Sequence, residues 1–268
     1  MGIRVKIIAA TDIGSRDENQ DRIVIDNFIL CSKYYYEEKD IVNPHFFLIF
    51  DGMGGEKFGS IAAQMASEEF VKFYRKGLSV FLTQKELVTI LEAMNNKITN
   101  SLGKMNVEGG TTFSLVILNV SGYIEVYNIG DSPVIYMDEK TVSILSEDQS
   151  LAGMKLQYGL ITDEEYAVSK EKNILMAYLG DYTNKSIQKL YYNSYQCQPG
   201  SRIILCSDGI TDVLSVQEIH KILYDEQKDI TELINQVKKE PECDNMSIID
   251  IVIQGGGFDE DSDVQTES

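Results

Sequence analysis

The chain has 268 residues, enough for one large domain or two small ones, and 43% of them are hydrophobic, so a full core can be buried. There are 42 acidic and 24 basic residues, and the net charge of −18 argues against binding to nucleic acids or anionic membranes, both of which attract Lys and Arg. No apolar run approaches the roughly 18 residues that a membrane-spanning helix needs, so we expect no membrane segment.

The first half of the chain is predicted to combine strands with two helices. Apolar residues at helical spacing predict a helix over residues 58–76. A second helix is expected over residues 84–102, because Thr83 and Glu86 form a capping-box signature at its start. Residues 33–43 are charged and rich in tyrosine, and are expected to form a hairpin loop. Apolar runs predict strands over residues 3–10, 23–31, 46–50, 113–120 and 123–129.

The second half contains a polar segment between short strands. Residues 146–172 are expected to be helical, and Gly153 and Gly159 suggest that this segment is mobile. Two short helices are predicted over residues 215–224 and 230–239. Further strands are predicted over residues 134–137, 141–145, 174–179, 187–195, 203–207 and 247–253.

The order of these elements indicates the fold class. Helices occur in pairs among antiparallel strands, and the hairpins exclude a purely parallel sheet. We therefore expect an α+β fold in which two antiparallel sheets form a sandwich covered by helices. One domain is predicted over residues 1–254, and residues 255–268, which are acidic and begin with glycines, are expected to form a disordered tail.

The stretch from Phe46 to Gly55 carries the first chemical signal. Five apolar residues lead directly into Asp51, and a glycine-rich turn follows. A run of this length between turn residues predicts a strand buried on both faces, with Asp51 at its mouth. Taken alone, the motif could equally be an ordinary Asp-Gly turn without a chemical role.

Three further aspartates stand at the ends of predicted strands. Asp131 and Asp208 follow apolar runs, and Asp244 precedes one. If these strand ends converge with Asp51, the carboxylates repel one another by about 4 kcal/mol per pair at 4 Å in an effective dielectric near 20. Divalent cations with oxygen ligands relieve such repulsion, and a carboxylate-rich shell favours Mg²⁺ or Mn²⁺. The sequence thus predicts a metal site at one edge of the sheets.

Seven motifs in order resemble those of the metal-dependent type 2C serine/threonine protein phosphatases, the PPM family, in their bacterial form. The resemblance covers about residues 3–254. The motifs are Arg16 with Asn19-Gln20-Asp21, Asp51 to Gly55, Gly110-Thr111-Thr112, Gly130-Asp131-Ser132, Asn173 to Gly180, Ser207-Asp208-Gly209 with Asp212, and Asp244 to Ser247. Each is weak alone, and together they are specific.

The resemblance implies a four-layer αββα fold with two Mn²⁺ or Mg²⁺ ions at one end of the central sandwich. Phosphoserine and phosphothreonine would be hydrolysed by attack of a water that bridges the ions. The implied metal ligands are Asp51, the Gly52 carbonyl, Asp208 and Asp244, with Asp131, Asp208 and Asp212 at a weaker third site. Gln20 and Asp21 would lie in the outer shell, Arg16 would grip the phosphate, and Arg16, Asp51 and Asp208 would be the catalytic residues. Residues 146–172 match the family's variable flap.

The sequence departs from the family pattern at several positions. Met53 stands where animal members carry a histidine thought to protonate the leaving group, and Gln20 stands where they carry an acidic ligand. Pro133 replaces a common arginine, and Gln149 stands where many bacterial relatives have histidine. The first two departures leave open where the leaving-group proton comes from and whether Gln20 acts through water.

Two other functions remain open from the sequence. One is a pseudophosphatase, a binding module that keeps the fold without the chemistry, and the other is a phosphatase dedicated to one anti-anti-sigma-type protein. The expected partners are phosphorylated proteins, with a Ser/Thr kinase and its substrates, and we expect a monomer. The four cysteines are scattered without a C-x-x-C pair, which favours free thiols in a reducing cytoplasm.

Overall fold

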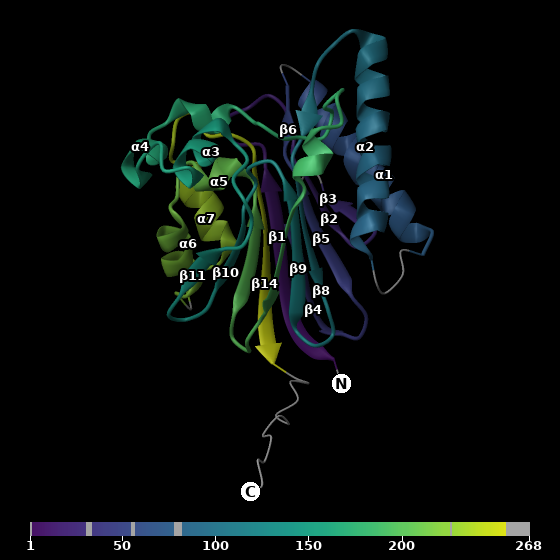
Figure 1. Cartoon of the computed structure of the whole chain (residues 1–268). Coiled ribbons are helices and arrows are strands. Elements are labelled where there is room, and N and C mark those ends of the chain that lie inside the picture. The colour runs from purple at the N-terminus through teal and green to yellow at the C-terminus, as the bar shows by residue number, and fades with distance from the viewer. Residues whose placement is uncertain (1, 31–33, 55–56, 78–81, 226, 256–268) are drawn as a thin grey trace, which may run out of the picture.

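The computed structural model describes residues 2–30, 34–54, 57–77, 82–225 and 227–255 (Figure 1). Of the predicted acidic tail, residues 256–268 lie outside these ranges, and Gly255 ends the last strand rather than opening the tail. The predicted domain limits therefore stay a prediction.

Two six-stranded antiparallel sheets form the centre of the molecule (Figure 1). The first contains, in spatial order, β11 (Val142–Ile144), β10 (Val134–Met137), β13 (Arg202–Cys206), β14 (Met246–Gly255), β1 (Ile3–Asp12) and β4 (Tyr34–Ile41). The second contains β12 (Tyr191–Gln196), β9 (Tyr123–Ile129), β8 (Phe113–Leu118), β5 (His45–Phe50), β2 (Arg22–Ile25) and β3 (Phe28–Leu30). A short ribbon pairs β6 (Gly52–Met53) with β7 (Gly110–Thr111).

The central strands are buried on both faces. In β5, Phe47 and Ile49 join the apolar cluster between the two sheets, whereas Phe46, Leu48 and Phe50 join the cluster beneath the helices. Because successive side chains of a strand point to opposite faces, a continuous apolar run is what such a strand requires. The predicted burial of this strand on both faces is confirmed.

Helices cover the outer face of each sheet (Figure 1). The second sheet packs against α1 (Phe58–Arg75) and α2 (Gln84–Met105), and the first against α5 (Asp208–Thr211), α6 (Val216–Leu223) and α7 (Ile230–Val237). At the start of α2, Thr83 and Glu86 form the predicted capping box. The resulting order of layers, helices–sheet–sheet–helices, confirms the predicted α+β sandwich.

Two predictions near the N-terminus are corrected. Residues 34–41 form the edge strand β4 rather than a hairpin loop, and they pair with β1 from Ile3↔Ile41 to Ala10↔Tyr34. Tyrosine favours strands, and the charged residues of this stretch can face water at a sheet edge. The predicted strand 23–31, whose last residue lies outside the described ranges, is divided into β2 and β3, because the chain turns at Asp26, whose φ of +55° breaks the extended backbone.

The predicted strand over residues 174–179 is also wrong. This segment makes only isolated bridges, from Leu175 to Ser150 and from Leu179 to Thr111. Before it, the flap is helical as predicted, with α3 (Leu151–Gln157), α4 (Asp163–Ala167) and the 3₁₀-helix η1 (Lys170–Asn173). The predicted strand 187–195 begins instead as a second 3₁₀-helix, η2 (Ser186–Lys189), and becomes β12 only afterwards. None of the helices within the described ranges is long and apolar enough to cross a membrane.

Candidate active site

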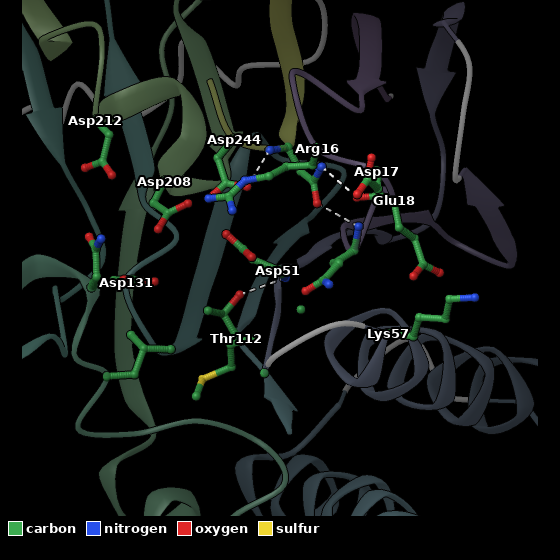
Figure 2. Close-up of a pocket in the computed structure, with 17 residues that line it drawn as sticks. Arg16, Asp17, Glu18, Asp51, Lys57, Thr112, Asp131, Asp208, Asp212 and Asp244 are labelled. Atoms are coloured by element: carbon green, nitrogen blue, oxygen red, sulfur yellow. Dashed lines mark hydrogen bonds and ion pairs between the residues drawn. The ribbon is translucent and has the colours of Figure 1, made fainter. Parts of the chain in front are cut away.

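Four strand ends meet at one pocket of about 830 Å³ (Figure 2). Asp51 follows β5, Asp131 follows β9, Asp208 follows β13 as the first residue of α5, and Asp244 precedes β14. The residues that line the pocket are Arg16, Asp17, Glu18, Gln20, Asp51, Gly52, Met53, Gly54, Lys57, Thr112, Asp131, Asn173, Leu175, Asp208, Asp212, Asp244 and Asn245. Apart from Asp21, every predicted site residue is therefore brought to one cavity.

Hydrogen bonds between three of the sequence motifs fix the position of Asp51. The Asp51 backbone N–H donates to Thr112 Oγ1 at 3.0 Å, and its carbonyl accepts from the Thr112 N–H at 2.8 Å and from Thr111 Oγ1 at 2.9 Å. Thr112 Oγ1 also shares a hydrogen bond of 2.8 Å with Ser132 Oγ. The motifs around Gly110 and Gly130 thus hold Asp51 at the end of its strand.

Two glycines allow the backbone to approach closely beside these aspartates. A Cβ added at Gly52 would lie 2.4 Å from the carbonyl oxygen of Gly59, so no larger residue fits next to Asp51. Gly130 has a φ of +110°, which L side chains rarely adopt, and its N–H donates to Gln149 Oε1 at 3.0 Å. Asp131 is therefore presented to the pocket by a turn that only glycine forms easily.

Asp208 begins the single-turn helix α5, and Asp212 is the residue that caps its C-terminal end. Their spacing of four residues places the side chains on the same side of a helix, and the Asp212 N–H donates to the Asp208 carbonyl at 2.7 Å. Figure 2 shows both carboxylates beside Asp131. The sequence prediction included both residues but missed this helix.

Asp21 lies behind the pocket rather than in it. Its residue is 1% exposed, its Oδ2 accepts from Ser207 Oγ at 2.8 Å, and its Oδ1 is buried without a hydrogen-bond partner. Burial raises the pKa of Asp21 to about 7, and the charges of Asp208 and Asp244 add to the effect, which its hydrogen bonds oppose. Ser207 precedes Asp208, so Asp21 supports the strand end that carries Asp208.

Burial and mutual repulsion disfavour the charged form of the central carboxylates. Burial raises the pKa of Asp208 to about 6, with a further contribution from the charge of Asp212. Burial and the charge of Asp208 raise the pKa values of Asp51 and Asp131 well above their ordinary range. A divalent cation would relieve this repulsion, and carboxylate oxygens are the ligands that Mg²⁺ and Mn²⁺ prefer. The chemistry of the pocket therefore fits the predicted metals.

The geometry of the carboxylates nevertheless differs from that of ligands around one ion. In the described part of the chain, the side chains of no three Asp, Glu, His or Cys residues are arranged to hold a single metal ion. Two of the pocket aspartates contact basic side chains: Asp244 Oδ2 lies 2.7 Å from Arg16 Nη2, and Asp212 Oδ1 lies 2.5 Å from Lys172 Nζ. The assignment of individual metal ligands therefore stays a proposal.

Arg16 lies on a loop that Asn245 holds in place. Asn245 Nδ2 donates to the carbonyls of Ile13 and Glu18 at 2.8 and 3.0 Å, and its Oδ1 accepts from the Gln20 N–H at 2.8 Å. Both sides of the Arg16–Asp244 pair are half-exposed, so Arg16 reaches the pocket from its rim (Figure 2). The contacts explain why the two motifs, which are far apart in sequence, form one site.

Sequence reasoning assigned no role to four charged residues at or near the pocket. Asp17, Glu18 and Lys57 line it, and Lys172 of the flap contacts Asp212. Asp17 and Glu18 lie between Arg16 and Asn19 of one recognised motif, and this place in the sequence is the signal that could have suggested them. Lys57 and Lys172 belong to no pattern in the sequence, because each reaches the pocket only through the folded arrangement of α1 and the flap.

A family model described as protein phosphatase 2C matches residues 38–241. The chain belongs to the protein phosphatase 2C family. Its predicted class of reaction, the hydrolysis of phosphoproteins at serine and threonine, is confirmed by this membership.

Relatives and solved structures agree with the family. The chain is 26% identical over 193 residues to the serine/threonine phosphatase stp of Listeria monocytogenes, a match that covers 70% of this chain and 74% of that protein. The fold is similar to that of the S. agalactiae serine/threonine phosphatase, with a TM-score of 0.78, 24% identity and coverage of 93% and 99%. It is also similar to the catalytic domain of PstP in complex with two manganese ions, with a TM-score of 0.71, 20% identity and coverage of 93% and 98%.

Proposed function

We propose that this protein phosphatase hydrolyses phosphoserine and phosphothreonine with two divalent cations, Mn²⁺ or Mg²⁺, held by Asp51, the Gly52 carbonyl, Asp208 and Asp244. One observation carries the proposal: the aspartates from four strand ends converge on one pocket, where burial and repulsion raise the pKa values of Asp51, Asp131 and Asp208. When bound, the metal pair neutralises phosphate oxygens and acidifies the attacking water.

The protein's own residues would position the ions and the substrate. Asp51 lies centrally in the pocket and is rigidly held by Thr111 and Thr112, which suits a ligand shared by both ions. Arg16 offers a planar fork of donors that matches two phosphate oxygens, which a lysine cannot do. Since Arg16 pairs with Asp244, the proposal requires Arg16 to exchange this carboxylate for the phosphate of the substrate.

The outer positions have distinct proposed roles. Asp21, through Ser207, would orient the strand end that bears Asp208, and Gln20 would act at the edge of the metal site through water. Asp131 and Asp212, with Asp208, would form a weaker third site. Met53 lines the pocket but has no proton to give, so the proton for the leaving group must come from another source, for which water at the third site is our proposal.

The proposed partners are phosphorylated proteins, including the substrates of a Ser/Thr kinase, and we propose that the enzyme acts as a monomer in the cytoplasm. The three cysteines within the described ranges, Cys197, Cys206 and Cys243, are free and buried, which agrees with a reducing compartment. The fractions that carry the activity in cell lysates, and the mass of the purified enzyme in solution, test these two points.

The deciding experiment measures phosphate release from a phosphothreonine peptide. The protein is stripped with a chelator, and Mn²⁺, Mg²⁺ or buffer is then added. We expect hydrolysis only after Mn²⁺ or Mg²⁺ is added, because carboxylate-rich sites bind these ions reversibly. Full activity in the chelator would disprove the metal assignment, and metal binding without hydrolysis would support a pseudophosphatase instead.

A further inference from the structure

The first residues of the flap (146–172) are held to the core by hydrogen bonds, such as that from the Gly130 N–H to Gln149 Oε1, and its last residue is held by a charged pair. Lys172 Nζ lies 2.5 Å from Asp212 Oδ1, and the side chains are only 18% and 39% exposed. Within the described part of the chain, no other ion pair or side-chain hydrogen bond links residues 151–172 to an element outside the flap. Besides the backbone bond from the Leu151 N–H to the Ile174 carbonyl, the contact with Asp212 is therefore the polar tie between this segment and the pocket wall.

The flap itself determines where Lys172 lies. Its Nζ is 5.6 Å from the centre of the Tyr166 ring, and the Tyr166 hydroxyl donates to Asp148 Oδ2 at 2.7 Å. Asp148 Oδ1 in turn accepts from the N–H of Ser150, the residue that caps α3. Lys172 is thus held on one side by an aromatic ring and on the other by Asp212, rather than extending freely into water.

Asp212 also belongs to the pocket. It lines the cavity together with Asp131 and Asp208, and Figure 2 shows the three carboxylates beside one another. The Asp212 carboxylate thus pairs with the Lys172 ammonium of the flap and also belongs to the group of pocket aspartates. A divalent cation placed between Asp131 and Asp212 would meet the positive charge of Lys172 at short range, and one Asp212 oxygen would already be engaged.

We propose that Lys172 is a positioning residue that fastens the flap to Asp212, and that a divalent cation bound by Asp131 and Asp212 must displace it. The Lys172 ammonium and the divalent cation compete for the Asp212 carboxylate. Binding of the ion at the third site therefore releases the flap, and pairing of Lys172 with Asp212 weakens binding of the ion. Such coupling is reciprocal: each event disfavours the other by the same factor. The competition rests on the proposed function, because the third site is part of it, whereas the contact between Lys172 and Asp212 does not.

Four variants separate this role from a general loosening of the flap. Lys172→Met keeps the length of the side chain and removes its charge, and Lys172→Arg keeps the charge. Asp212→Asn removes the charge of the partner. Lys155→Met is the matched control, because Lys155 pairs with Glu171 inside the flap at 2.6 Å and does not contact Asp212.

The first measurement counts bound Mn²⁺ by electron paramagnetic resonance as the ion is titrated. We expect Lys172→Met to bind the third and weakest ion at least about fivefold more tightly than the wild type does. This factor is at the low end of the couplings found between two binding sites. Lys172→Arg and Lys155→Met should bind it as the wild type does. Equal affinity for the third ion in the wild type and in Lys172→Met would overturn the proposal.

The second measurement follows chymotrypsin cleavage after Tyr158 and Leu160, which are 73% and 69% exposed. Without metal, we expect chymotrypsin to cleave Lys172→Met and Asp212→Asn at the same rate, and faster than it cleaves the wild type. The double variant should be cleaved no faster than either single variant. Mn²⁺ at concentrations that fill the third site should accelerate cleavage of the wild type and leave Lys172→Met unchanged. Cleavage of Lys172→Met at the wild-type rate without metal would also overturn the proposal.

The two readouts keep this proposal distinct from the proposed function. If the wild type binds no Mn²⁺, the metal-dependent function is wrong, while the metal-free cleavage rates still test the contact between Lys172 and Asp212. If two ions bind and activate the enzyme but Lys172→Met gains nothing at the third, the function stands and the competition is wrong.

Discussion

Asp250, inside the first sheet, and the pocket aspartates at the ends of its strands are neutralised in different ways. Asp250, inside β14, is fully buried, and its Oδ2 lies 3.0 Å from Nη2 of Arg202 on the neighbouring strand β13. Asp208 and Asp244 stand at the ends of these two strands and face the pocket, where seven acidic side chains are described and only two basic ones, Arg16 and Lys57.

The number of basic side chains nearby distinguishes Asp250, an acid with a structural role, from the pocket aspartates, which are arranged to bind a ligand. Asp250 has one arginine beside it, which also donates to the Leu223 carbonyl and lies over the Tyr224 ring, so the protein itself supplies the cation that pairs with it. The pocket aspartates outnumber the basic side chains around them, so a further cation is needed for all of them to ionise. Burial alone does not mark a catalytic acid; an excess of acids over nearby basic groups does.

The largest expected effect comes from changing a pocket acid. Asp208→Asn should lower kcat for p-nitrophenyl phosphate and for a phosphothreonine peptide alike, by on the order of 10³-fold, because it removes a charge that acts in the transition state. The same change should raise the melting temperature of the chelator-treated protein, since it relieves repulsion within the cluster. Activity above a tenth of the wild-type value would remove Asp208 from the metal site.

Replacing the structural acid, Asp250, should lower stability and leave activity unchanged, the opposite of what is expected for Asp208. Asp250→Ala leaves Arg202 buried without its partner, so we expect the free energy of unfolding to fall by about 3 kcal/mol while kcat of the folded enzyme stays near the wild-type value. Urea unfolding and steady-state kinetics measure the two effects. As a control, the double variant Arg202→Met, Asp250→Leu removes both charges and should recover much of the lost free energy of unfolding. A loss of kcat in folded Asp250→Ala would show that Asp250 and the pocket acids are coupled.

The pH dependence of stability distinguishes Asp250 further. Burial raises its pKa to about 6 from an ordinary value of 3.8, an effect that Arg202 opposes without cancelling. The folded protein therefore binds this proton more tightly than the unfolded chain does, and the resulting stabilisation is present below pH 4 and lost as the pH rises to about 6, by roughly 3 kcal/mol. Unfolding free energies of the wild type and Asp250→Asn should diverge across this window; parallel curves would show that Asp250 keeps an ordinary pKa.

Replacing Arg16 should have the smallest effect on stability, in contrast to the buried Arg202. Arg16 and Arg202 both pair with an aspartate, but the Arg16–Asp244 pair is half-exposed, and such pairs contribute about 0–1 kcal/mol. Arg16→Ala should barely change the unfolding free energy, and should raise KM for a phosphopeptide about tenfold through the loss of charged hydrogen bonds to phosphate. An unchanged KM would leave Arg16 as a surface residue.

The sequence predicted the parts of the site that follow a local pattern. Asp51, Asp131, Asp208 and Asp244 could be found because each lies at the end of an apolar run, and burial of strands on both faces makes such runs continuous. Helices α1 and α2 were predictable from spacing and capping.

The parts that escaped prediction depend on contacts distant in sequence. Helix α5 has four residues, too few for a periodic pattern, and Lys172 meets Asp212 across 40 residues. The segment 174–179 looks like a strand, but its backbone bonds to Leu151, Gln149 and Thr111 form only two isolated bridges, so no ladder forms. The backbone bonds that a strand-like segment finally makes are set by its neighbours in the fold.

The central position of β14 also determines when this enzyme can begin to work. The strand inserts between β13 and β1, and the residues just before it, Asp244 and Asn245, hold the Arg16 loop, with the Arg16–Asp244 pair spanning 228 residues of chain. Pairings so distant in sequence form slowly, and chains emerge from the ribosome N-terminus first. The apolar cluster beneath α1 and α2 can therefore form on a nascent chain that has no complete pocket, and phosphatase activity begins only after β14 has been synthesised and inserted.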